Sequence, residues 1–131
     1  KQAPGGPAMI NLMFEGRRDK LVNKYRERMD DRTLEERVAA LSEIQNEGGY
    51  MTRWSADGEE PDTYRLHEYN CPVAQVANRY RQACHCELQL FERLLGAEVE
   101  RTECLADGDM RCTYAIRGGK AVSNKAASGR A

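Results

Sequence analysis

The sequence has no long hydrophobic run and no excess of charge of either sign. No stretch approaches the roughly 18 apolar residues that a membrane-spanning helix needs, and no secretory signal is visible at its start. We therefore expect a cytoplasmic protein with no membrane partner. The 131 residues include 20 Lys and Arg against 21 Asp and Glu, for a net charge of −1. That balance is not typical of a surface that coats nucleic acid or binds polyanions.

Motifs of the common enzyme classes are missing as well. Gly118-Gly119-Lys120 lacks the upstream glycine and the Ser or Thr of a phosphate-binding loop, and neither G-x-S-x-G nor H-E-x-x-H occurs. The two histidines, His67 and His85, fall in different predicted elements. We therefore expect that the chain is not an enzyme.

The cysteines are few, odd in number and unevenly placed. An odd number without a visible secretory signal argues against a disulfide framework. In a reducing compartment such cysteines are buried thiols, metal ligands or redox sensors. All of them lie in the C-terminal half of the chain: Cys71, Cys84, Cys86, Cys104 and Cys112. This clustering is the most informative feature of the sequence.

The hydrophobic pattern predicts an α+β chain with the element order ααββαββ and antiparallel strands. Residues 1–7 are expected to be a flexible lead-in. Two helices fill residues 8–48, a linker and dimerisation region, and a capping-box pattern at Thr33 opens the second helix. Residues 49–116 form a cysteine-containing domain of two β-hairpins around a long helix, which runs from about Val73 to Leu95. Residues 117–131 are expected to be a disordered basic tail.

The first predicted helix has an apolar stripe at spacings of three and four. Such a stripe must be buried, and we expect it to pack across the two-fold axis of a homodimer. Its members are Ile10, Phe14, Leu21, Tyr25 and Met29. The opposite, basic face of this helix is interpreted as a solvated surface rather than as a contact to DNA phosphates.

Helix and strand periodicity predict the direction in which each cysteine side chain points. A turn of about 100° per residue places Cys84 in the apolar stripe of the long helix and Cys86 on the opposite face. Alternation in the second hairpin points Cys112 inward and Cys104 outward, although a bulge at the turn would reverse this. Cys71 stands at the mouth of the long helix, where the helix dipole favours a thiolate.

Cys71, Cys84 and Cys112 are therefore expected to converge. Three thiolates suit an iron–sulfur cluster or a zinc ion. No C-x-x-C pair is present, and the gaps of 12 and 27 residues between these cysteines do not decide between the two. Ordinary buried cysteines remain the alternative interpretation.

Several segments resemble a known family. Glu68-Tyr69-Asn70-Cys71-Pro72-Val73, the stretch Val99-Glu100-Arg101-Thr102 and the end Gly108-Asp109-Met110-Arg111-Cys112-Thr113-Tyr114 are similar to the C-terminal sensor domain of SufR-type transcriptional regulators. These are winged-helix repressors of iron–sulfur assembly operons. The resemblance covers about residues 14–116.

The resemblance implies a redox or iron–sulfur sensor that acts as a homodimer. Cys71, Cys84 and Cys112 would hold an iron–sulfur cluster, in particular [4Fe–4S], with zinc as the alternative. Operator DNA would be bound only through an N-terminal winged helix, for which residues 1–131 have no room. Some family members carry a further cysteine just before Val99, where this chain has none. The fourth iron ligand is therefore open among Cys104, Cys86, His85, a carboxylate and a small exogenous ligand.

Two other classes of function stay open at this point. A zinc-stabilised structural or interaction domain would use the same thiols without a cluster. A small-ligand-binding domain would use the cysteines only for packing.

Overall fold

The computed structural model describes residues 7–71 and 81–118 and confirms the α+β class. In chain order its elements are α1 (Pro7–Tyr25), the short 3₁₀ helix η1 (Arg26–Arg28), α2 (Leu34–Glu47), β1 (Thr52–Ala56), β2 (Thr63–Glu68), α4 (Arg81–Leu95), β3 (Glu98–Glu103), the 3₁₀ turn η2 (Leu105–Asp107) and β4 (Cys112–Arg117). The expected lead-in, the start of the long helix and most of the expected tail lie outside the described residues. Helix α1 begins at Pro7, one residue before the predicted start of the helical region at residue 8. Strand β4 ends at Arg117, one residue after the predicted end of the cysteine-containing domain at residue 116.

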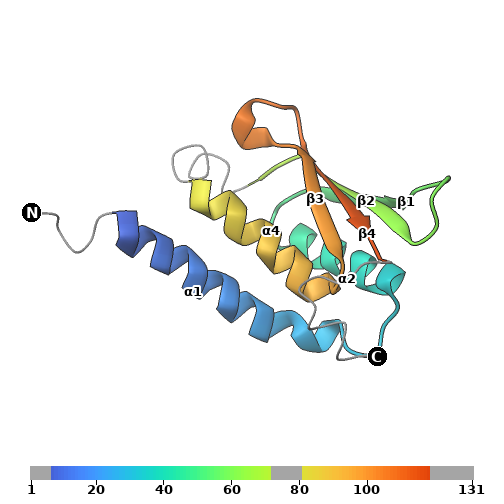
Figure 1. Cartoon of the computed structure of the whole chain (residues 1–131), viewed down its shortest axis with the longest axis horizontal. Coiled ribbons are helices and arrows are strands. Elements are labelled where there is room, and N and C mark those ends of the chain that lie inside the picture. Colours follow the sequence, from blue (N-terminus) through green and yellow to red (C-terminus); the bar gives the residue numbers. More distant parts are fainter. Residues whose placement is uncertain (1–6, 72–80, 119–131) are drawn as a thin grey trace, which may run out of the picture.

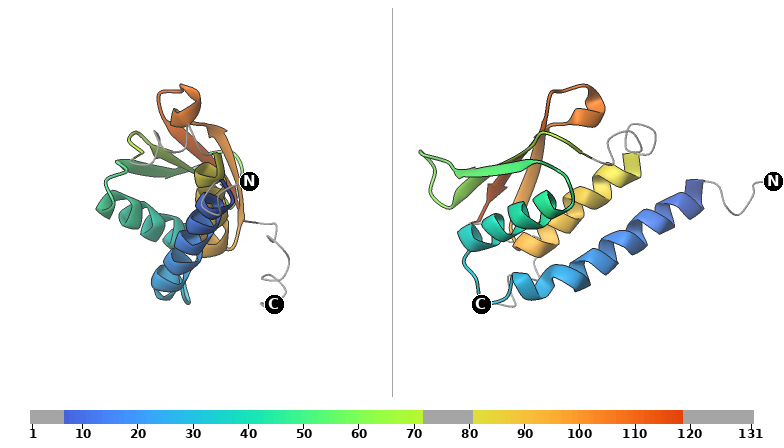
Figure 2. Two further views of the ribbon diagram at one scale, coloured as in Figure 1. Left: turned by 90° about the vertical axis from the view of Figure 1, so that its left-hand side faces the viewer. Right: turned by 180° about the vertical axis from the view of Figure 1, so that it is seen from behind.

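The two predicted hairpins join into a single antiparallel sheet with the strand order β1-β2-β4-β3. Helices α2 and α4 lie on one side of this sheet, and α1 runs along α4 on the side of α4 that faces away from the sheet (Figures 1 and 2). The core lies between the sheet and the two helices. Its fully buried members include Val38, Leu41, Leu66, Phe91, Leu95, Tyr114 and Ile116.

Local signals in the sequence explain how α2 starts. The backbone N–H of Glu36 donates to Thr33 Oγ1 at 3.1 Å, and the Thr33 N–H donates to Glu36 Oε1 at 2.9 Å. This is the capping box that the sequence predicts, and it satisfies two backbone donors that the first helical turn leaves without partners.

Part of the apolar stripe of α1 packs within the chain, and the expectation that the stripe meets a two-fold partner stays a prediction. Leu21 and Tyr25 pack against the core. Arg18 Nη1 donates to Gln89 Oε1 at 2.6 Å, and Arg93 of α4 forms an ion pair with Asp19. A homodimer itself stays a prediction.

Within residues 7–71 and 81–118, no helix combines the length and the apolar character that crossing a membrane requires.

Candidate functional site

The thiols gather where three segments meet at one end of the sheet. The end of β2, the described start of α4 and the η2 turn between β3 and β4 lie side by side in both views (Figures 1 and 2). Cys71 follows β2, Cys84 lies in the first described turn of α4, and Cys112 opens β4. Cys104 comes directly before η2.

Cys104 points inward, contrary to the direction predicted from strand alternation. Along β3 and β4, Val99 pairs with Ile116 and Arg101 pairs with Tyr114, but Glu103 then pairs with Thr113. The register therefore shifts by one residue between Arg101 and Glu103. A one-residue shift exchanges the two faces of a strand, and this one turns Cys104 into the core, where it is 6% exposed.

Three thiols consequently become neighbours. Cys104 is close enough to Cys84 and to Cys112 to raise the pKa of both thiols. The Leu105 N–H in the η2 turn donates to Cys112 Sγ at 3.2 Å. The inward direction predicted for Cys112 is confirmed by its burial.

Burial dominates the ionisation of these thiols. It raises the pKa of Cys112 to about 12, against the effect of the Leu105 N–H, and it raises the pKa of Cys84 against the effect of Arg101. Both side chains are therefore neutral thiols at pH 7 while nothing is bound to them. A buried neutral thiol is a poor nucleophile, and because the thiolate is also the form that binds metals, a metal would have to displace the protons of these thiols.

Cys71 lies at the same end of the sheet but belongs to a different local environment. It is half-buried and close enough to Tyr50 to contribute, after burial and Glu87, to the raised pKa of that phenol. It follows Glu68 by three residues, and Glu68 is the strand partner of Cys112. Residues 72–80, which would form the predicted helix mouth, lie outside the described residues.

The other sulfur and imidazole candidates point elsewhere. Cys86 lies on the opposite side of α4 from Cys84, as the helical periodicity predicted. It is buried under α1, where Gln82 Nε2 donates to Cys86 Sγ at 3.6 Å and Arg18 is close by. His85 is exposed. Among residues 7–71 and 81–118, no three His, Cys, Asp or Glu side chains form a group tight enough for a single metal ion.

A buried pair of acids lies beside the thiols. Gln45 Nε2 donates to Glu68 Oε2 at 2.8 Å and to Glu87 Oε2 at 3.3 Å, so one amide bridges two carboxyl groups. Glu68 is fully buried. Burial, followed by the charge of Glu87, raises the pKa of Glu68 to about 8, and burial raises the pKa of Glu87 as well.

Glu87 of this pair borders a small cavity of about 80 Å³ between α1, α2 and α4, whose lining also includes Arg17, Gln45 and Tyr50. Sequence reasoning missed the pair because ionisable side chains are seldom fully buried. A signal was present, since Tyr64, Leu66 and Glu68 alternate on one face of β2 and Glu87 lies one helical turn before Phe91.

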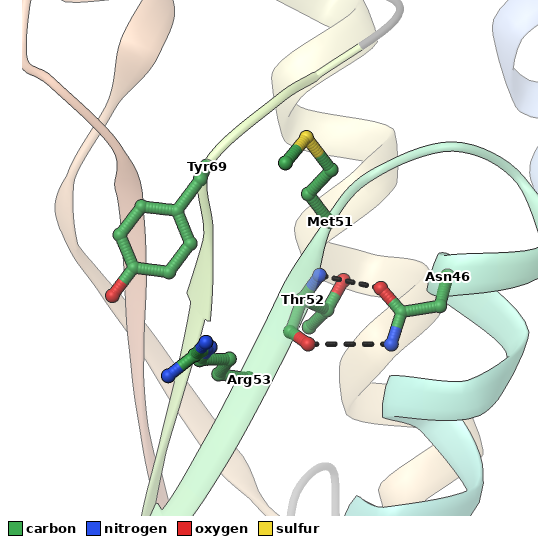
Figure 3. A pocket seen from close by; sticks show the side chains of 5 residues that line it. All are labelled: Asn46, Met51, Thr52, Arg53 and Tyr69. Carbon is green, nitrogen blue, oxygen red and sulfur yellow. Dashed lines mark hydrogen bonds between the residues drawn. The ribbon is translucent and has the colours of Figure 1, made fainter.

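A larger surface pocket of about 510 Å³ lies at the edge of β1 (Figure 3). Asn46 braces it, because its amide donates to the Thr52 carbonyl at 3.2 Å and accepts from the Thr52 N–H. These bonds hold the backbone next to Met51, which has a φ of 52°. Tyr69 and Arg53 also line it, and among the described lining residues there is no carboxylate, thiol or imidazole. The contacts indicate a structural brace rather than a reactive site.

No model of a protein family, no curated protein and no solved structure matches this chain.

Proposed function

We propose that this chain is the iron–sulfur cluster-binding sensor domain of a transcriptional repressor that acts in the cytoplasm. The observation that carries the proposal is the convergence of Cys84, Cys104 and Cys112 from three elements, with Cys71 at the same end of the sheet. The resemblance of the segments around Cys71 and Cys112 to SufR-type regulators supports the same conclusion.

Thiols are the kind of donor that an iron–sulfur cluster uses, and the described thiols would have to move closer together to hold one. Thiolates are the ligands that hold such clusters, and hydrogen bonds to the sulfurs tune them; the Leu105 N–H supplies one such bond to Cys112 Sγ at 3.2 Å. A bound cluster would supply soft-metal redox chemistry. Cys84, Cys112 and Cys71 would provide the thiolates for it.

The thiols and α1 are connected through contacts of α4. Cys84 belongs to α4, and the other side of α4 holds α1 through Gln89 with Arg18 and through Arg93 with Asp19. A change in how Cys84 is held therefore alters a helix that packs directly on α1. A sensor needs an element whose arrangement differs between two states, and the α1–α4 pair is the element that we assign to this role. In the proposed repressor α1 belongs to the dimerisation region, and DNA is bound by a winged helix outside these 131 residues.

Anaerobic purification followed by a visible spectrum and by assays of iron and acid-labile sulfide tests the proposal. We expect iron and sulfide in the wild-type chain, and loss or destabilisation of both when Cys71, Cys84 or Cys112 is replaced by Ser. Ser keeps the size of the side chain but is a poor ligand for soft metals.

Cys86→Ser is the matched control, because that thiol is buried on the other side of α4. Full retention of iron in Cys84→Ser would remove the basis of the proposal. Stoichiometric zinc without sulfide in the wild-type chain would instead favour a zinc-stabilised domain.

A further inference from the structure

We infer that the surface pocket at the edge of β1 binds a small organic anion with a flat apolar body, such as an aromatic carboxylate. The pocket has a volume of about 510 Å³, a size that is typical of sites for small ligands. Its described lining consists of Asn46, Met51, Thr52, Arg53 and Tyr69 (Figure 3). The inference goes beyond the proposed function and does not depend on the thiols.

Hydrogen bonds fix the chain segments that form the pocket. The segment after β2 is held to the segment before β1, because the Tyr69 N–H donates to the Met51 carbonyl at 3.0 Å. From α2, the side chain of Asn46 bonds both backbone groups of Thr52. The walls are therefore in place before a ligand arrives, and binding costs little ordering of the chain.

Met51 has an unfavourable backbone conformation and an exposed side chain. Its φ of 52° lies in the left-handed region, which residues other than Gly, Asn and Asp seldom adopt, and its side chain is 63% exposed. Strain of this kind collects at sites that bind ligands. The Tyr69 ring is exposed as well. A thioether and an aromatic ring together offer the apolar contact that a flat ligand needs.

Arg53 gives the pocket a positive charge. Its side chain is exposed, and it forms no ion pair with any residue that the structure describes. A guanidinium binds the two oxygens of a carboxylate through two parallel hydrogen bonds. Because the described lining contains no carboxylate, the pocket matches an anion from solution better than a cation.

Tyr69 supplies a second donor for an anion. Its hydroxyl oxygen accepts from Arg111 Nη1 at 3.3 Å, so its own O–H proton is directed elsewhere. Figure 3 shows this hydroxyl and the Arg53 guanidinium on the same side of the two strands. The acid of the same network, Glu103, already forms an ion pair with Arg111 at 2.8 Å, which reduces its repulsion of a bound anion.

Backbone-amide NMR of the full chain, titrated separately with benzoate, benzamide and benzylamine, tests the inference. The three probes share one ring and differ in charge. We expect benzoate to shift the amide signals of residues 46–53 and of Tyr69 with a Kd of about 1 mM, the range of fragment-sized ligands. Benzamide and benzylamine should bind about tenfold more weakly, because they cannot form the charge-assisted pair with Arg53.

Two variants and a control locate the site. Arg53→Gln removes the cation, so it should weaken benzoate binding about tenfold and leave benzamide binding unchanged. Arg32→Gln makes the same change of charge at an exposed position outside the pocket and should bind benzoate like wild type. Met51→Gly relieves the strain and removes the thioether, so it should unfold at a higher urea concentration and bind benzoate more weakly.

Three results would overturn the inference. These are equal binding of benzoate and benzamide by the wild-type chain, shifts confined to residues outside the pocket, and equal benzoate binding by Arg53→Gln and wild type. The first two come from the wild-type chain, so a folding defect in a variant does not hide the answer. A wild-type chain that holds no iron and sulfide would overturn the proposed function alone, because these titrations do not involve the thiols.

Discussion

Replacing Glu68 by Gln should stabilise the fold at neutral pH. Glu68 is fully buried at the end of β2, and only its Oε2 has a hydrogen-bond partner among the described residues, the amide of Gln45. Burial and the neighbouring Glu87 raise the pKa of Glu68 from 4.5 to about 8. A carboxyl group whose pKa is higher in the folded chain keeps its proton after the unfolded chain has lost it. Stability therefore falls as the pH rises from 4.5 to 8.

The size of this effect follows from the two pKa values. Each pH unit between them lowers the free energy of unfolding by about 1.4 kcal/mol, so the loss between pH 4.5 and pH 7 is about 3 kcal/mol. A Gln at position 68 does not titrate and still accepts a hydrogen bond from Gln45. Because a neutral hydrogen bond contributes only about 1 kcal/mol, imperfect geometry in the variant would remove part of the gain. We expect Glu68→Gln to be about 2 kcal/mol more stable than wild type at pH 7.

Urea unfolding at pH 5, 6, 7 and 8, followed by circular dichroism and by Trp54 fluorescence, measures this effect. The wild-type free energy of unfolding should fall across the series, and that of Glu68→Gln should fall much less. Glu59→Gln, at an exposed position in the β1–β2 loop, is the control and should follow the wild-type curve. Parallel curves for Glu68→Gln and wild type would refute the reasoning, because they would show that Glu68 ionises equally in the folded and unfolded chains.

Two further substitutions test the fold itself by chemical denaturation. Thr33→Ala removes one side of the capping box at the start of α2 and should lower the free energy of unfolding by about 1 kcal/mol, while Thr33→Ser should retain most of it. Phe91→Ala removes a fully buried ring that packs edge-on against Tyr114 at a centroid distance of 4.8 Å, and it should cost about 3 to 5 kcal/mol. A loss below 1 kcal/mol for Phe91→Ala would contradict the described core.

Local signals made most of the fold predictable. The Thr33 capping box, the alternation in the strands and the phase of the long helix each depend on residues a few positions apart. These short-range patterns act through backbone geometry that tertiary contacts seldom reverse. The phase placed Cys84 and Cys86 on opposite sides of α4, and the structure keeps them there. What the pattern missed is that α1 covers the Cys86 side, which buries both sides of α4.

The candidate site was less predictable because it depends on one irregularity. The register shift between Arg101 and Glu103 changes which side chains after it face the core. Neither Arg nor Glu is a residue type that indicates a β-bulge. Strand alternation alone therefore predicted that Cys104 points to the outer face of the sheet, whereas it points into the core. The same limit applies to the acids, since the position of Glu68 in β2 was compatible with burial but its charge favoured the surface.

These departures from local rules collect at one end of the sheet. Arg101 is partly buried and forms no direct ion pair among the described residues. Two carboxyl groups share one amide, and a strand irregularity turns a third thiol inward. Each of these features costs stability when taken alone, and local conflicts of this kind are expected where function constrains a sequence. Arg101 favours the ionised forms of Glu68 and Glu87, but burial outweighs its effect, which is why the acid pair is predicted to respond to pH.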